Sequence, residues 1–422
     1  MPIPALRSTH RFAPLAVACL VLAAGCTPAP TATPAPTSTI APPSASPAAS
    51  QVSATEIYAR IRSQVEAIRG LQPTKDVDPV TIDAAQLRTN LETEFDKENT
   101  VDALRFSEET LITLGLLPPG SSLRKLTLDF EAGQVAGYYS PDRKELFVVS
   151  RSGALGPAEE VTYAHEFTHQ LQDQTFDLSK LGLDSANQSD RALAQLSVVE
   201  GDAVSVQTRW TAENLTAEEL GQLLTASLDP AAIEALRNAP PYLRDTALFP
   251  YQDGFAFVSN RIAAGGYSAV DGVFADLPTS TEQVLHPEKY AARELPIKVK
   301  LPAELAATLG AGWKNAGEDT LGEFILQTWL TVHGVPGATA REATVGWGGD
   351  RLELLRGPNG ATTVFLETVW DNVLDAAEFA AAAKTAIAGI RPEGTVLFVE
   401  QAPRVYVTLG ARAGEIAPRF FR

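Results

Sequence analysis

A pentapeptide in the first half of the chain contains the types of side chain that commonly bind metal ions in proteins. It reads His165-Glu166-Phe167-Thr168-His169. Residues four apart lie on one face of a helix, so both imidazoles could reach one zinc ion, with Glu166 beside the open coordination position. The carboxylate of Glu166 could then accept a proton from the water that the zinc ion activates. The pattern predicts a hydrolytic zinc site with His165 and His169 as ligands and Glu166 as catalytic base.

The alternative is a helix in which the two histidines only form hydrogen bonds. A chance match with Glu in second place is expected on the order of 0.002 times in such a chain. The segment also begins as helices do, with Pro157 in the first turn and Glu159 and Glu160 near the positive end of the helix dipole. Both observations favour the metal site.

A zinc hydrolase usually has a third protein ligand. Residues 170–174 lack the glycine and histidine with which the metzincin pattern continues after its second histidine. Glu200 is the better candidate, because it shares a face of the next predicted helix with Leu193 and Leu196 and is therefore expected to be buried. A buried carboxylate needs a partner, and a zinc ion is sufficient. An internal ion pair with Arg or Lys is the alternative.

Together, His165-Glu166-x-x-His169 and Val199-Glu200-Gly201-Asp202-Ala203 resemble the motifs of the gluzincin zinc metallopeptidases. The wider stretch from Gly137 to Ala203 is similar to an uncharacterised group of bacterial lipoproteins. The resemblance implies a zincin-like fold, one Zn²⁺ ion held by the two histidines and Glu200, and a peptide or protein substrate.

The resemblance departs from the family pattern at Val204, where many gluzincins have an Asp that supports a ligand. Asp173 and Asp202 are the candidates to replace it. The resemblance also implies a strand that binds the peptide as an added strand, and residues 134–139 and 145–149 fit that place. An ordinary hairpin that covers the helix is the alternative.

A hydrolase of this kind also needs a hydrogen-bond donor for the oxyanion that develops on the substrate. Tyr251, His286 and Tyr290 are the candidates. Each has an alternative as a polar residue satisfied at a turn.

The amino terminus predicts export and lipid attachment. Arg7 and Arg11 precede an apolar run, and small residues lead to Cys26, as in a bacterial lipoprotein signal. We therefore expect a signal peptide at 1–25, lipid on Cys26, and a Pro/Ala/Ser/Thr-rich tether over 26–50. An ordinary signal peptide or a short membrane anchor is the alternative. The predicted location is extracytoplasmic, on the cell membrane or on the outer membrane of a cell that has two.

Composition excludes one class of partner. Asp and Glu number 51 against 34 Lys and Arg, which gives a net charge of -17 over 422 residues. This charge repels phosphate backbones, so we expect no nucleic acid partner. Cys19 and Cys26 are the two cysteines, so the exported part has no internal disulfide.

Hydrophobic periodicity predicts an α+β protein with helices over 52–68, 84–116, 156–174, 189–210, 217–238 and 254–264. Strands are predicted at 126–130, 134–139 and 145–149. The tail has a strand–strand–helix–strand–strand order, at 351–355, 362–369, 375–390, 396–400 and 405–408.

These elements predict a mainly helical, zincin-like metallopeptidase domain with a small sheet over 51–320, and an α+β module over 321–422. The predicted function is a membrane-anchored zinc peptidase. A non-catalytic binding or scaffold lipoprotein with a structural or vestigial zinc site is the alternative.

Overall fold

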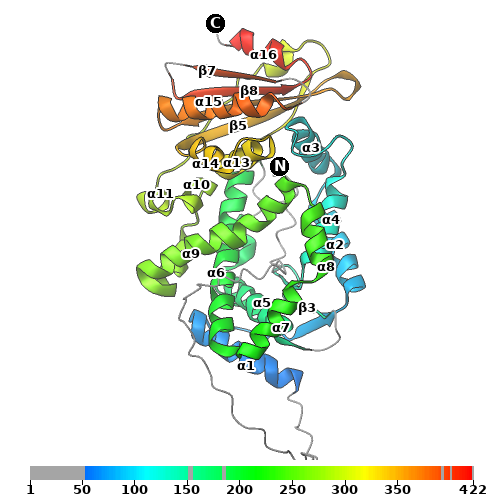
Figure 1. Cartoon of the computed structure of the whole chain (residues 1–422), viewed down its shortest axis with the longest axis vertical. Helices are drawn as coiled ribbons and strands as arrows, with labels where there is room; N and C mark the ends of the chain where they lie inside the picture. Colours follow the sequence, from blue (N-terminus) through cyan, green and yellow to red (C-terminus); the bar gives the residue numbers. More distant parts are fainter. Residues whose placement is uncertain (1–52, 151–154, 183–186, 391–393, 400–401, 421–422) are drawn as a thin grey trace, which may run out of the picture.

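The computed structural model describes residues 53–150, 155–182, 187–390, 394–399 and 402–420. The predicted signal peptide, Cys26 and the tether lie outside these residues. The protein is of the α+β class, with many helices, a three-stranded sheet and a five-stranded sheet (Figure 1). Within the described residues, the helices are too short or too polar to span a lipid bilayer.

Four helices and a small sheet form the amino-terminal part. The helices are α1 (Ala54–Arg69), α2 (Ala84–Glu98), α3 (Val101–Thr113) and α4 (Leu123–Gln134). The strands are β1 (Pro79–Ile82), β2 (Gly137–Ser140) and β3 (Glu145–Val149). The strand β3 lies in the middle, parallel to β1 and antiparallel to β2.

The prediction of a strand at 126–130 is wrong, because these residues lie within α4. The alternation of Leu126, Leu128 and Phe130 suggested a strand, but Leu123, Thr127 and Phe130 are buried at helical spacing. The Ser122 side chain caps this helix by accepting a hydrogen bond from the Lys125 N–H. The predicted strand at 134–139 is correspondingly shorter and begins at Gly137.

The central helices follow. They are α5 (Pro157–Phe176), the 3₁₀ turn η2 (Leu178–Lys180), α6 (Ser189–Asn214), α7 (Ala217–Ser227), α8 (Pro230–Asn238) and α9 (Pro241–Ala275). The helix α9 starts well before the predicted residue 254, contains Pro250, and is broken by non-helical backbone at Gly265 and Gly266, next to the predicted end at 264. Phe249, Phe257 and Val258 are buried along α9, and this burial outweighs the one backbone hydrogen bond that a proline removes.

Two glycines allow α6 and α9 to pack closely. A Cβ atom on Gly201 would lie 2.3 Å from the Gly254 carbonyl oxygen, and a Cβ atom on Gly254 would lie 2.3 Å from the Ser197 carbonyl oxygen. The two backbones therefore touch at this point. Since Gly201 follows Glu200 in the chain, this contact also fixes how deeply Glu200 is inserted between the helices.

The remaining elements lead into the five-stranded sheet, which has the order β4-β5-β6-β8-β7 with all neighbours antiparallel. The helices are α10 (Thr281–Leu285), α11 (Pro287–Ala292), α12 (Leu305–Thr308), α13 (Gly322–Val332), α14 (Gly337–Glu342), α15 (Val373–Ile387) and α16 (Ala413–Phe420). The strands are β4 (Lys314–Asp319), β5 (Trp347–Arg356), β6 (Thr362–Trp370), β7 (Gly394–Val399) and β8 (Arg404–Gly410), and the 3₁₀ turn η3 (Pro358–Gly360) joins β5 to β6. The strand–strand–helix–strand–strand order of the tail is confirmed, while β4 was not predicted.

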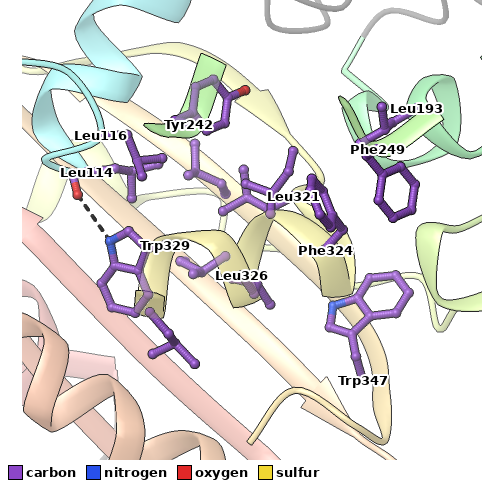
Figure 2. Packing of buried hydrophobic residues seen from close by; sticks show 14 of the residues in the cluster. Leu114, Leu116, Leu193, Tyr242, Phe249, Leu321, Phe324, Leu326, Trp329 and Trp347 are labelled. Carbon is purple, nitrogen blue, oxygen red and sulfur yellow. Dashed lines mark hydrogen bonds between the residues drawn. The ribbon is translucent and has the colours of Figure 1, made fainter. Parts of the chain in front are cut away.

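The five-stranded sheet lies at one end of the molecule, and α1 lies toward the other (Figure 1). The helices α13 and α15 cover one face, and α12 and α16 cover the other. The helix α13 joins the sheet to the helical part: Trp329 donates a hydrogen bond to the Leu114 carbonyl, and the Phe324 ring packs 4.1 Å from that of Phe249 (Figure 2). One hydrophobic core therefore runs from the central helices into the sheet.

Asp350 fixes the start of α13 from strand β5. Its carboxylate accepts hydrogen bonds from the backbone N–H groups of Leu321 and Gly322 at 2.9 and 2.8 Å, and from the Trp347 indole at 3.0 Å. Burial nevertheless raises the pKa of Asp350 to about 6, because loss of solvent penalises the charge more than these donors stabilise it.

The α6–α9 contact can be tested by adding one methyl group. We expect Gly254→Ala to lower the free energy of unfolding by about 1–3 kcal/mol, because the backbones must separate. Gly272→Ala is the control, in the helical segment of α9 that follows the break at Gly265 and Gly266, where nothing lies within 4 Å of the added Cβ. It should be neutral or add about 0.5–1 kcal/mol. Equal effects of the two substitutions in urea unfolding would contradict the close contact.

Asp350 should make stability depend on pH. Because its folded pKa is above its unfolded value, it stabilises the fold below pH 4, and this contribution is lost as the pH rises through 6. Between pH 4.5 and 7.5 the parent should lose about 2 kcal/mol more than Asp350→Asn does. Urea unfolding at several pH values measures this difference. Parallel stability curves would show that Asp350 is not the group responsible.

Candidate metal centre

Two helices supply the predicted metal ligands. The helix α5 carries His165, Glu166 and His169, and α6 carries Glu200. All four side chains are at most 2% exposed. Along α5 every residue from 161 to 173 is buried, because α1, α6, α7, β2 and β3 all pack against it.

The ligand atoms converge. The Nε2 atoms of His165 and His169 lie 3.0 Å apart, and the nearer Glu200 carboxylate oxygen lies 3.3 and 3.4 Å from them. Ligands about 2.0–2.1 Å from a tetrahedral zinc ion lie about 3.3–3.4 Å from one another. The three atoms therefore have the separations of three corners of such a tetrahedron, and the group could hold a metal ion.

A glutamine holds the other ring nitrogen of each histidine. His165 Nδ1 lies 2.8 Å from the Gln207 side-chain oxygen, and His169 Nδ1 lies 2.8 Å from that of Gln172. An amide oxygen only accepts, so both Nδ1 atoms carry the proton and both Nε2 atoms of the neutral rings present a lone pair. Three lone-pair donors then face one another inside the protein, an arrangement that a cation stabilises.

Burial and neighbouring groups have opposite effects on the pKa of each of two ligands, His165 and Glu200. Burial lowers the pKa of His165 and so favours the neutral ring that binds metal. For Glu200, burial alone would raise the pKa, but the interactions with His169 and His165 outweigh it and lower the pKa. The geometry thus favours neutral histidine and ionised glutamate, which are the protonation states that coordinate a metal.

Glu166 is in a different environment. Among the described residues, neither oxygen of its buried carboxylate has a hydrogen-bond partner that meets normal geometry. Burial, followed by the charge of Glu200, raises its pKa well above the usual value, while the backbone N–H of Tyr139 works in the opposite direction. Glu166 is therefore an unpaired carboxyl group with a strong affinity for a proton.

The two predicted supporting acids have different places. Asp202 reaches His169 only through Gln172, whose amide nitrogen lies 2.9 Å from the Asp202 carboxylate. Asp173 is not in contact with the ligands: its carboxylate accepts hydrogen bonds at 2.7 Å from the Tyr139 hydroxyl and from the Lys144 ammonium. Asp173 therefore ties the β2–β3 hairpin to α5.

One of the three candidate oxyanion donors lies beside the ligands. The Tyr251 ring stacks near His165, with a centroid distance of 6.2 Å and an angle of 22°. The alternative, a polar residue satisfied at a turn, does not apply to Tyr251, because it is inside α9 and one turn before Gly254.

The other two candidates are engaged elsewhere. His286 Nε2 lies 3.0 Å from the Glu323 carboxylate, and the hydrogen bond to Glu323 raises the pKa of His286. The Tyr290 hydroxyl donates to the Asp276 carbonyl at 2.8 Å. The structure brings neither side chain to the ligand group.

The strand β2 lies next to Glu166; among the described residues it pairs with one strand, β3, and its four residues are buried. The carbonyls of Ala136 and Ser140 accept hydrogen bonds from Val149 and Lys144 on the β3 side. By the alternation of an antiparallel pair, the backbone groups of Gly137 and Tyr139 point to the other edge. A Cβ atom on Gly137, which would project from the face of the sheet, would lie 3.4 Å from the Glu166 side chain, so this face of β2 packs against α5 at the site.

A second acidic group, Glu282, Glu294 and Asp371, also has the spacing of metal ligands. The Lys289 ammonium lies among these three carboxylates, at 2.6, 2.8 and 2.8 Å from them. A cation therefore already occupies the centre of this group, which distinguishes it from the histidine-containing site.

Sequence reasoning missed Gln172, Gln207 and Arg69. Gln172 lies three residues after His169, and Gln207 lies seven residues after Glu200, so both fall on the ligand faces of their helices. That spacing could have suggested them. Arg69 pairs with Asp202 in the interior, and nothing local in the sequence marks it.

Comparisons with known proteins add one match. Residues 308–415 match a family described as a domain of unknown function (DUF8575). This segment includes all five strands of the larger sheet, while α5 and α6 lie outside it. No curated protein and no solved structure matches the chain significantly. The predicted domain boundaries stay predictions.

Metal binding should require Glu200. We expect Glu200→Gln to weaken binding of Zn²⁺ or Co²⁺ by at least about 100-fold. Even the loss of a residue that only hydrogen-bonds to a ligand typically lowers metal affinity by about 10–100-fold. At about 100 times its Kd, Zn²⁺ should stabilise the parent by about 2.7 kcal/mol, and a chelator should reverse this gain. Calorimetric titration and thermal unfolding measure both effects.

His286→Ala is the matched control, because this histidine is a half-buried partner of Glu323 outside the ligand group. It should bind metal as the parent does. If Glu200→Gln were stabilised by Zn²⁺ as much as the parent, the three-ligand assignment would be wrong.

Proposed function

We propose that this protein is a zinc-dependent peptidase of gluzincin type, with a zincin-like arrangement of the helices that carry its ligands. One observation carries the proposal: three ligand atoms from two buried helices converge at 3.0–3.4 Å, beside an unpaired buried carboxyl group. His165, His169 and Glu200 would hold the ion. When bound, a zinc ion supplies Lewis acidity that polarises the scissile carbonyl and makes water a better nucleophile.

Glu166 is the general base of the proposed reaction. Its carboxylate takes a proton from the attacking water and then gives that proton to the nitrogen of the leaving amine. The raised pKa fits this role, because a desolvated carboxylate binds a proton more strongly than an exposed one.

A peptide substrate is supported by the edge of β2 and by the gluzincin resemblance. The outward backbone groups of Gly137 and Tyr139 can form main-chain hydrogen bonds with an added strand. Within the described part of the small sheet, β2 is the edge strand next to Glu166, although its four residues are buried. Tyr251 is the candidate donor to the oxyanion, because its ring lies beside His165.

The proposal includes the location. The lipoprotein-like sequence up to Cys26 and the tether at 26–50 would hold the enzyme outside the cytoplasm, attached to a membrane by lipid. Peptides or proteins in that compartment would be the substrates, and the acidic surface disfavours nucleic acid.

The catalytic role of Glu166 separates an enzyme from a binding or scaffold protein with the same metal site. Glu166→Gln keeps the shape but cannot take a proton, so we expect peptide hydrolysis to fall by at least about 100-fold while Zn²⁺ content stays equal to the parent's. A quenched peptide library and elemental analysis measure the two quantities.

Glu160→Gln is the matched control, because Glu160 is on the same helix but pairs with the partly exposed Arg60. It should keep the parental rate. A zinc-loaded parent that cleaves no peptide, or a Glu166→Gln variant as active as the parent, would favour the scaffold function instead.

A further inference from the structure

A buried chain of polar contacts runs from α1 to one of the ligand histidines. The Arg69 guanidinium lies 2.9 Å from the Asp202 carboxylate, and both side chains are fully buried. Asp202 lies 2.9 Å from the Gln172 amide nitrogen, and the Gln172 oxygen lies 2.8 Å from His169 Nδ1. The four side chains come from α1, α6 and α5 and are linked at hydrogen-bond distance throughout.

Gln172 can present either its oxygen or its nitrogen to His169, and only one choice suits a metal ligand. Its NH₂ group donates to the Asp202 carboxylate and, at 3.0 Å, to the Val199 carbonyl. Both groups only accept, so they force the oxygen toward His169. The oxygen then requires the proton on Nδ1, which leaves the Nε2 lone pair for the metal.

Asp202 can do this as a carboxylate only if its buried charge is compensated. Arg69 supplies the compensating charge, since an unpaired carboxylate at this depth would be strongly unfavourable. Arg69 is itself fixed by Asp271 at 2.7 Å and by the Tyr267 ring, which lies 5.0 Å away. The Arg69 guanidinium is thus held by α9 and directed toward Asp202 on α6.

We propose that Arg69 is a positioning residue for the metal centre, acting through Asp202 and Gln172 to hold His169 in its metal-binding tautomer. The inference rests on the proposed metal site but does not require that the site cleave peptides. Its consequence is that α1, which lies more than 90 residues before the ligands in the chain, contributes to metal retention.

The test is the rate at which the full chain releases metal to a coloured chelator, supported by the visible spectrum of the Co²⁺ form. We expect Arg69→Met to release zinc about 10–100-fold faster than the parent and to change the Co²⁺ spectrum. Arg60→Met is the matched control, because Arg60 is also on α1 and pairs with α5 at Glu160, but its side chain is 53% exposed. It should release metal within about twofold of the parental rate.

Gln172→Met provides a second variant, which removes the contact to His169 while keeping volume and leaving the Arg69–Asp202 pair in place. It should also release metal about 10–100-fold faster, and it tests the chain even if Arg69→Met does not fold. Measuring the unfolding of the metal-free proteins separates lost stability from lost metal retention.

The outcomes are distinct. If the parent binds metal but folded Arg69→Met and Gln172→Met release it at the parental rate, the positioning role is wrong and the metal site stands. If only Gln172→Met accelerates release, Arg69 is a structural residue. A parent that binds no metal overturns both the site and the positioning role, whereas a metal-binding parent without peptidase activity overturns the proposed function alone.

Discussion

Three lone pairs that face one another inside a protein repel unless a cation lies between them. His165, His169 and Glu200 are in this situation, because the proton of each imidazole is used by a glutamine on the opposite side of the ring. The packing of the surrounding helices keeps these three side chains close together. The helices α5 and α6 hold them in the buried interior.

The contrast with the second acidic group makes the constraint clearer. Glu282, Glu294 and Asp371 also converge, but the Lys289 ammonium lies among them and satisfies all three. A cluster of acids is therefore not enough to indicate a metal site. The histidine site differs because two of its three ligand atoms are imidazole nitrogens that direct lone pairs toward the Glu200 carboxylate.

Support for the site extends well beyond the two ligand helices. The Gly201–Gly254 contact sets the depth of α6 against α9 and brings Tyr251 close to His165. Asp173 ties the strand β2 to α5, the helix that carries the base and two of the three ligands. The core that stabilises α9 continues into the five-stranded sheet through α13, which links the carboxyl-terminal part to the helices that position the site.

Local spacing determined the part of the site that lies within one helix. Two histidines four apart must share a helix face, and a Glu in an apolar stripe must be buried, so the sequence by itself predicted His165, Glu166, His169 and Glu200. Capping residues and periodicity likewise located most helices. Periodicity missed the short helices α10 to α14 and α16, and it misassigned α4, where the alternation of Leu126, Leu128 and Phe130 fits a strand as well as a helix.

Tertiary structure decided everything that depends on contact between distant segments. The packing of α1, α6 and α9 decides which acid supports His169, which tyrosine lies beside His165, and why Asp202 tolerates burial. No local sequence pattern marks a buried Gln or Arg in advance. Tyr251, His286 and Tyr290 were equal candidates in the sequence, and only one lies near the ligands. The physical reason is that helix geometry fixes neighbours within a few residues, whereas packing across helices depends on shape complementarity summed over the whole core.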